Sequence, residues 1–199
     1  MNIIIVGASG TIGRAVHQHL EALGHSIITV GRSSGDIRCD ITDETRLAGM
    51  WEEAGPVDAL VCTAGEVPYA PVGELSAADF TSAWTRKALA QINLVRTGLD
   101  HVSPTGSFTL ISGIPSRDPV VQGAAAATAN GAVEAFVRTA AVEIAPRRIN
   151  VVSPSVLSES LDAFGDFFPG FPPVDGADVA RAFQKAIEGA STGQTITLP

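Results

Sequence analysis

Apolar positions follow two different patterns along the chain. Short runs of β-branched and other apolar residues are typical of strands covered on both faces, and residues 3–6 are the first such run. Between the runs, apolar residues recur every three or four positions, as in helices that bury one side. These patterns predict strands at residues 3–6, 27–30, 57–62, 107–112, 149–153 and 194–198, and helices at 12–23, 124–145 and 177–188, with a long helix after Ser76.

The alternation of strands and helices predicts an α/β protein. Repeated strand–helix–strand units form an open, doubly wound parallel sheet between two helix layers, with ligands bound beyond the carboxyl ends of the strands. One connection departs from this scheme, because residues 31–35 are fewer than the dozen or so that a parallel crossover usually needs. We therefore expect the helix between strands two and three to be shortened or absent, with residues 36–39 forming a tiny strand or an extended loop. No linker or repeat interrupts residues 1–199, which we expect to form one domain.

Composition and charge narrow the function classes. The 199 residues are 45% hydrophobic and 17% charged, which suits a folded globular protein. The net charge of −8 argues against general nucleic-acid binding but leaves a local anion site possible. No apolar run approaches the roughly 20 residues of a membrane span, and residues 1–6 lack the basic start of a signal peptide. Two cysteines, Cys39 and Cys62, are too few for a disulfide framework or a zinc site. We therefore expect no metal and a cytoplasmic location.

A glycine-rich segment at residues 7–13 separates the first strand from the first helix. Glycines at its first, fourth and seventh positions let the backbone turn tightly and approach a pyrophosphate, and the helix N-terminus behind them offers free N–H groups. In this context the segment favours dinucleotide binding over a plain strand-to-helix turn. The expected contacts are Gly7, Ser9, Gly10, Thr11, Ile12 and Gly13.

The end of the second strand indicates which dinucleotide is bound. An acidic residue there would bind the ribose 2′-hydroxyl of NAD, whereas an arginine accommodates the 2′-phosphate of NADP. Arg32 stands at this place, with Ser33 after it and no acidic residue. The sequence therefore predicts NADP(H), with a solvated turn arginine as the alternative. Asp40 and Ile41 are expected to flank the adenine, with Asp40 accepting from its amino group.

In order and spacing, these segments resemble the short-chain dehydrogenase/reductase family over nearly the whole chain. The resemblance implies a Rossmann-type fold, a nicotinamide cofactor and carbonyl–alcohol redox chemistry on a small-molecule substrate. It also implies a homodimer or homotetramer, usually built on the two longest helices. The matching segments are residues 7–13, Asp40, Thr63, Ala64 and Gly65 in place of the family's Asn-Ala-Gly, the region of Ser112, residues 124–145 and residues 149–154, and the implied cofactor contacts also include Pro154 and Val156.

The catalytic residues of the family are not matched. The family uses a tyrosine as acid and base, a lysine four residues later, a serine and an upstream asparagine. Alignment places Ala126 at the tyrosine position and Asn130 at the lysine position. It places Gly113 at the serine position and Lys87 at the asparagine position. An alanine has no proton to give and an asparagine carries no charge, so the usual mechanism is in doubt while cofactor binding is not.

Three residues are candidates to replace this machinery. Lys87 should project from the long helix into the vacated space, where its ammonium could hold the nicotinamide ribose or polarise a carbonyl; the alternative is a solvated helix residue. Ser112 could bond a substrate oxygen or only cap the strand end. Tyr69, the one tyrosine, could donate a proton, although packing or substrate contact is favoured. A phenylalanine-rich loop at residues 164–173 would make an apolar lid, or else a core patch or oligomer contact.

Two hypotheses follow from the sequence. The first is a divergent NADP(H)-dependent reductase that uses Lys87 and Ser112 beside the nicotinamide. The second is a non-catalytic NADP(H)-binding protein, either a redox sensor or a regulatory subunit. They differ in whether a protic group replaces the missing tyrosine at Ala126.

Overall fold

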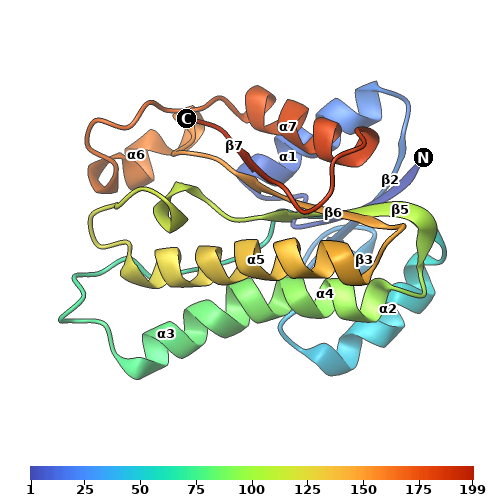
Figure 1. Cartoon of the computed structure of the whole chain (residues 1–199), viewed down its shortest axis with the longest axis horizontal. Helices are drawn as coiled ribbons and strands as arrows, with labels where there is room; N and C mark the ends of the chain where they lie inside the picture. The colour runs from blue at the N-terminus through green and yellow to red at the C-terminus, as the bar shows by residue number, and fades with distance from the viewer.

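A seven-stranded parallel sheet forms the centre of the computed structural model, which describes residues 1–199 (Figure 1). The strand order is β3-β2-β1-β4-β5-β6-β7, and every neighbouring pair is parallel. The direction of winding reverses between β1 and β4. The strands are β1 (Asn2–Val6), β2 (Ser26–Gly31), β3 (Ile37–Arg38), β4 (Val57–Cys62), β5 (Val102–Ile111), β6 (Arg148–Ser153) and β7 (Thr195–Thr197).

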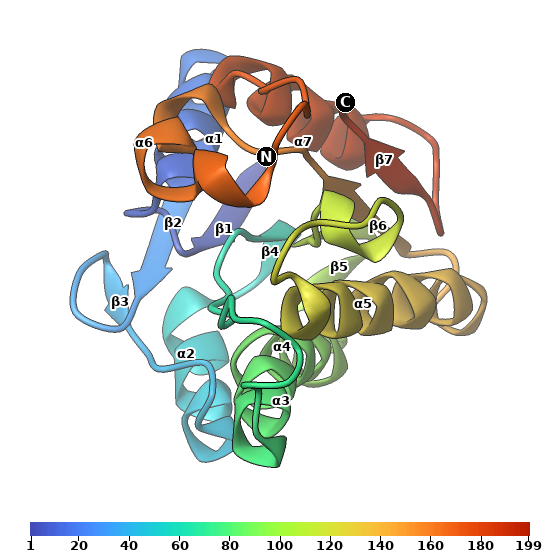
Figure 2. The ribbon, with the colours of Figure 1, turned by 90° about the vertical axis from the view of Figure 1, so that its left-hand side faces the viewer.

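Helices cover both faces of the sheet, so the predicted three-layer, doubly wound architecture is confirmed (Figures 1 and 2). On one face lie α1 (Thr11–Ala22) and α7 (Gly176–Glu188). The other face carries α2 (Leu47–Ala54), α4 (Ala90–Gly98) and α5 (Ala124–Glu143). Helix α3 (Ala77–Ala83) leads into α4. The short helix α6 (Leu161–Phe164) follows β6. No helix combines the length and apolar composition that crossing a membrane requires.

The continuous apolar run of β1 is explained by this two-sided cover. Ile3 and Ile5 point into the core beneath α1 and α7, whereas Ile4 and Val6 point into the core beneath α2, α4 and α5. All four side chains are buried because successive residues of a strand face opposite sides of the sheet. A strand that is solvated on one face would alternate apolar and polar residues instead.

The helix between β2 and β3 is absent, as the sequence predicts, and β3 is the tiny strand that the short connection allows. Val30 pairs with Ile37, and Gly31 pairs with Arg38. Asp36 closes the connecting turn, because one of its carboxylate oxygens accepts hydrogen bonds from the backbone N–H of Thr29 at 2.8 Å and from its hydroxyl at 2.7 Å. These bonds lower the pKa of Asp36. The turn therefore holds Arg32 beside the carboxyl end of β2.

The long helix predicted after Ser76 is not regular throughout. A capping box between Ser76 and Asp79 starts α3. A π-helical segment, Trp84–Leu89, then joins α3 to α4. Such segments are rare and occur frequently at functional sites. This one carries both Arg86 and Lys87.

Two helices, α2 and α6, and the start of strand β5 also depart from the sequence predictions. Helix α2 was not predicted, although its buried residues Leu47, Met50 and Trp51 have helical spacing. Strand β5 begins at Val102, five residues before the predicted start at residue 107. Polar and turn-forming residues such as Ser103, Pro104 and Gly106 hide this first part of the strand.

Close packing of α2, α4 and β5 predicts opposite effects for two glycine-to-alanine changes. A Cβ atom on Gly98 would lie 2.5 Å from Cζ2 of Trp51 and 3.2 Å from Cε1 of Phe108. We expect Gly98→Ala to lower the free energy of unfolding by about 1–3 kcal/mol. Gly49, exposed on α2 with open space around its Cα, is the control, and Gly49→Ala should raise stability by up to about 1 kcal/mol. Urea unfolding would measure both, and an equal effect at the two positions would contradict this packing.

Candidate functional site

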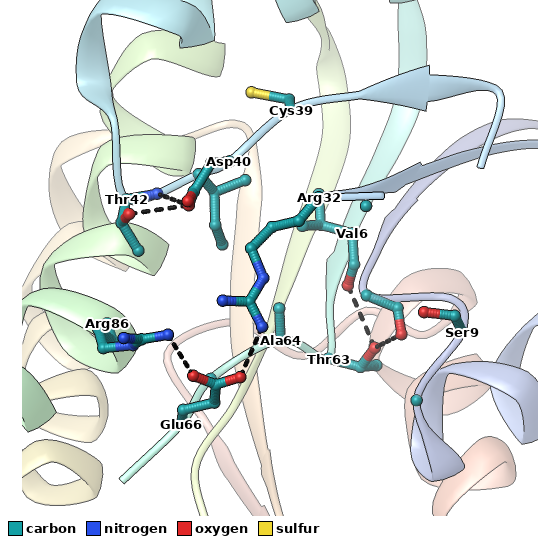
Figure 3. A pocket seen from close by; sticks show the side chains of 15 residues that line it. Val6, Ser9, Arg32, Cys39, Asp40, Thr42, Thr63, Ala64, Glu66 and Arg86 are labelled. Carbon is teal, nitrogen blue, oxygen red and sulfur yellow. Dashed lines mark hydrogen bonds and ion pairs between the residues drawn. The ribbon is translucent and has the colours of Figure 1, made fainter. Parts of the chain in front are cut away.

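A cavity of about 270 Å³ lies at the carboxyl ends of β1, β2 and β4, where the winding of the sheet reverses (Figure 3). Ligands of open α/β sheets bind at such a switch point. Nine of the residues predicted to bind cofactor line it. They are Gly7, Ser9, Gly10, Arg32, Asp40, Ile41, Thr63, Ala64 and Gly65.

The glycine-rich segment forms one wall of this cavity. Gly7 has a φ of +89°, and a Cβ there would lie 2.9 Å from the backbone nitrogen of Ala64. A Cβ on Gly13 would lie 2.1 Å from the carbonyl oxygen of Gly7. Gly10 precedes α1 and gives its N-terminus no side-chain cap, so the free N–H groups remain available to an anion. The backbone is therefore open to a phosphate where side chains would fill the space.

The hydroxyl of Thr63, directly after β4, links the end of β4 to the glycine-rich segment after β1. Oγ1 of Thr63 lies 3.1 Å from the carbonyl oxygens of both Val6 and Gly7, so it donates to one or the other. Thr11, Ile12 and Gly13 lie in the first turn of α1 behind the loop and do not line the cavity. Their contribution is to hold the loop and the helix end in place.

Charged side chains gather at the opposite end of the cavity. Nη2 of Arg32 donates to Oε1 of Glu66 at 2.7 Å, and Nη2 of Arg86 donates to Oε2 of Glu66 at 2.5 Å. Asp40 accepts hydrogen bonds from the backbone N–H and hydroxyl of Thr42, at 3.0 and 2.8 Å, and these bonds lower its pKa. Asp40 is therefore a carboxylate at neutral pH and can accept from a ligand. Ser33 is exposed in the turn after Arg32 and does not line the cavity.

Glu66 and Arg86 were missed by sequence reasoning. Glu66 follows the Thr63-Ala64-Gly65 triplet directly, which is the only local signal for its position. Arg86 lies 20 residues further along, on a different element. Their meeting at the cavity depends on how the π-helical segment turns toward β4.

Lys87 is buried and points toward the carboxyl end of β5. It is 9% exposed, and its Nζ lies 3.4 Å from the carbonyl oxygen of Ser112. Its stem passes against Gly65, where a Cβ would come within 2.8 Å of Cγ of Lys87. The alternative of a solvated helix residue is therefore wrong. The inward position places an amine beside a residue that lines the cavity.

The ammonium of Lys87 has no carboxylate partner. Burial lowers the pKa of Lys87 from 10.5 to about 8. The neighbouring Cys62 does not neutralise it, because burial raises the pKa of that thiol to about 12 and keeps it protonated. Titratable groups with such strongly shifted pKa values cluster at functional sites.

Ser112 does not present a free hydroxyl. Its Oγ donates to Oε1 of Glu134 at 2.7 Å, and Ser116 and Ser153 donate to the same oxygen at 2.7 and 3.2 Å. Ser112 and Glu134 are both buried. These bonds fasten the ends of β5 and β6 to α5, so the structure supports the strand-end role, and the hydroxyl proton of Ser112 is engaged by Glu134.

Tyr69 packs into an aromatic cluster with three phenylalanines of the loop after β6. Its ring stacks on Phe167 with centroids 4.8 Å apart, and Phe164 and Phe168 lie at 6.1 and 6.4 Å. Burial raises the pKa of Tyr69. A raised pKa makes the phenol a poorer proton donor. The structure therefore favours packing over the proton-donating role.

Polar atoms without partners lie near the ends of β5 and β6. Nδ2 of Asn130 lies 3.4 Å from the carbonyl oxygen of Gly113, but Oδ1 of Asn130 and Oγ of Ser155 are buried without a partner. Unpaired buried polar atoms are costly and call for an explanation, such as a ligand or an ordered water. Pro154 and Val156 flank Ser155 and are buried outside the lined cavity.

Comparison with known families matches residues 6–187 to a family model described as enoyl-(acyl carrier protein) reductase. Among solved structures, the protein lin1944 from Listeria innocua is 47% identical with a TM-score of 0.97, over 100% of both chains. A small-chain dehydrogenase in complex with NADPH is 26% identical with a TM-score of 0.89, over 100% of this chain and 96% of that chain. This chain belongs to the short-chain dehydrogenase/reductase family.

This short-chain dehydrogenase/reductase differs in length from some of its relatives. Hydroxynaphthalene reductase arp2 from Aspergillus fumigatus is 24% identical over 151 residues, a match that covers 75% of this chain and 54% of that protein. Helix α5, where the alignment expects the family's tyrosine and lysine, contains neither residue type. Lys87, from the π-helical segment, is instead the lysine that reaches this part of the fold.

The unpaired charge of Lys87 predicts a pH-dependent cost to this dehydrogenase/reductase fold. The pKa is about 8 in the folded chain and near 10.5 in the unfolded chain, so the unfolded state binds more protons between these values and the free energy of unfolding rises with pH there. Lys87→Met keeps the length and removes the charge. It should be more stable than the wild type by about 3 kcal/mol at pH 7.

This gain should shrink above pH 8 and vanish above pH 10.5. Urea unfolding at several pH values would measure the difference. Lys185→Met at the exposed Lys185 of α7 is the control and should show no such trend. A gain for Lys87→Met that stays constant over this pH range would contradict the lowered pKa.

Proposed function

We propose that the chain is an NADP(H)-dependent oxidoreductase that interconverts a small carbonyl compound and its alcohol, with Lys87 as the proton donor. The observation that carries this proposal is the buried, unpaired ammonium of Lys87 at the carboxyl end of β5, against Gly65 of the cavity wall. A buried charge without a counter-ion destabilises the fold. The presence of Lys87 in the core is therefore best explained by a function.

The cavity offers contacts for the adenosine and pyrophosphate half of a dinucleotide, and the nicotinamide half would extend beyond it. The glycine loop and the N-terminus of α1 would hold the pyrophosphate, and Arg32 would hold the 2′-phosphate. Asp40 and Ile41 would flank the adenine, and residues 63–65 would lie along the ribose. Pro154 and Val156 would support the nicotinamide end, where Ser155 and Asn130 leave polar atoms without partners. Support comes also from the related dehydrogenase that was solved with NADPH.

Lys87 is suited to move a proton near neutral pH. Bound NADPH would supply the hydride. With a pKa of about 8, Lys87 is mostly protonated at pH 7 and yet gives up its proton at low cost, as an efficient general acid requires. The carbonyl oxygen of Ser112 holds the ammonium in place. The substrate oxygen would receive a hydrogen bond, and then a proton, from Nζ of Lys87.

The second hypothesis, a non-catalytic sensor or regulatory protein, has less support. No observation favours it, and an amine with a pKa near the working pH has no evident use in a protein that only binds the cofactor. Membership of a family of oxidoreductases also argues for turnover. We therefore propose an enzymatic rather than a non-catalytic function.

We further propose a cytoplasmic homodimer or homotetramer. The free, buried thiols of Cys39 and Cys62 suit a reducing compartment. On the longest helices, Val142 of α5 is 80% exposed, and Trp84 is exposed in the π-helical segment before α4. These apolar side chains give a surface on which a second copy could pack.

The cofactor assignment predicts a selective loss in Arg32→Ala. Because NADH lacks the 2′-phosphate, the variant should bind NADPH about tenfold or more weakly and NADH almost unchanged. Arg38→Ala is a matched control, since Arg38 is exposed on the neighbouring β3 and does not line the cavity. Isothermal titration would measure the affinities of both cofactors for the wild type and the two variants. Equal losses for the two cofactors would reject Arg32 as the phosphate contact.

The proposed role of Lys87 predicts a loss of turnover and a defined pH profile. Lys87→Met should lower kcat by about 10²–10⁴-fold with a panel of aldehydes, ketones and quinones, since a positioned acid contributes that much. In the wild type, carbonyl reduction should fall as pH rises through about 8, where the ammonium loses its proton. NADPH consumption would be followed by absorbance, with Lys185→Met as the control. Tight NADPH binding without turnover of any carbonyl compound would reject the proposed enzymatic function.

A further inference from the structure

Glu66 lies between Arg32 and Arg86 at the mouth of the cavity, and this arrangement has no role in the chemistry above (Figure 3). The three side chains come from the end of β2, the segment after β4 and the π-helical segment. Each guanidinium takes a separate carboxylate oxygen, at 2.7 and 2.5 Å. The side chains of Arg32, Glu66 and Arg86 are 56%, 57% and 43% exposed, so an incoming ligand can reach all three.

The three side chains carry two positive charges and one negative charge, and the carboxylate of Asp40 lies on the same cavity wall. The positive field of both arginines also reaches Asp40 on the cavity wall and helps its hydrogen bonds with Thr42 to lower the pKa of Asp40. Both guanidiniums therefore act on the cavity itself.

We propose that Arg86 is a second contact for the 2′-phosphate of NADP(H), and that Glu66 fills the place of this phosphate in the free protein. This inference rests on the NADP(H) function proposed above. A carboxylate offers two oxygens to two guanidiniums, and a phosphate monoester offers three oxygens with nearly two negative charges. The phosphate is thus the stronger partner for the same pair of arginines.

Glu66 must leave when the phosphate arrives. If Glu66 stayed, its charge and the nearly two negative charges of the phosphate would face only the two positive charges of Arg32 and Arg86. Breaking the ion pairs of Glu66 costs little free energy, because exposed ion pairs are weak and the side chain of Glu66 is more than half exposed. NADH brings no phosphate, so Glu66 can then remain seated between the two arginines. Arg86 and Glu66 would therefore set the preference between the two cofactors.

The π-helical segment explains how one element serves both ends of the site. Arg86 lines the cavity at its charged end, and the next residue, Lys87, is buried with its Nζ toward Ser112. Adjacent helical residues point in different directions around the axis, so the two cations reach different places. One short segment thus carries a phosphate contact and a proton donor.

The test measures the affinities of NADPH, NADH, 2′,5′-ADP and 5′-AMP at one low salt concentration, since salt screens exposed charges. The two fragments isolate the adenosine half of the cofactor. The variants are Arg86→Ala, Glu66→Gln and the double variant. Arg96→Ala is the matched control, because Arg96 lies on α4, pairs with Glu44 and does not line the cavity. Circular dichroism would check that each variant folds.

We expect Arg86→Ala to weaken NADPH and 2′,5′-ADP about tenfold and to leave NADH and 5′-AMP within about twofold. Glu66→Gln should strengthen NADPH and 2′,5′-ADP severalfold. The double variant decides whether Arg86 acts directly, because removing Arg86 alone also leaves Glu66 bound to Arg32. If Arg86 contacts the phosphate, the double variant binds NADPH more weakly than Glu66→Gln.

Three results would overturn this inference. If the double variant equals Glu66→Gln, Arg86 acts only through Glu66 and is no phosphate contact. If Glu66→Gln weakens NADPH, Glu66 does not compete with the phosphate. Either result leaves the proposed function intact as long as Arg32→Ala still loses NADPH selectively. If the wild type binds NADPH no better than NADH, the NADP(H) assignment and the role of Arg86 both fail.

Discussion

The close contact between Gly7 and the end of β4 is the constraint on which the site depends. The backbone nitrogen of Ala64 occupies the space that a Cβ of Gly7 would fill, and the hydroxyl of Thr63 reaches the carbonyl oxygens of Val6 and Gly7. This contact holds β1 and β4 together where the winding of the sheet reverses, which leaves the cavity open at their ends. The glycine loop and residues 63–65 take their positions from it.

The polar groups near the ends of β5 and β6 show a balance between stability and the proposed function. Lys87 is buried without a counter-ion, and Oδ1 of Asn130 and Oγ of Ser155 are buried without partners. Each of these costs free energy in the folded protein. By contrast, Ser112 and Glu134 are well paired and fasten β5 to α5. Oγ1 of Thr109, within β5, is also buried without a partner, so only some of the unsatisfied groups lie near the ends of β5 and β6.

Much of the fold followed from local patterns, and the misses have physical reasons. The run at residues 3–6 and the short connection at residues 31–35 correctly predicted a two-sided sheet and a missing helix. The first half of β5 was missed because its residues have poor strand propensity and form an irregularity, where the pairing with β4 passes from Val102 directly to Ser107. In the site, the glycine loop was predictable since its chemistry lies within residues 7–13. The hydrogen bonds of Ser112 and the stacking of Tyr69 were not, because their partners lie far away in the chain.

The sequence by itself determined the sheet, the glycine loop, Arg32 at the end of β2 and the lack of a tyrosine and a lysine on α5. Periodicity and backbone requirements are local, so they can be read from neighbouring residues. Only the tertiary structure decided that Lys87 is buried and that Glu66 lies between Arg32 and Arg86. Arg86 and Lys87 lie in a π-helical segment that the sequence pattern did not predict, and ion pairs form between residues that only folding brings together.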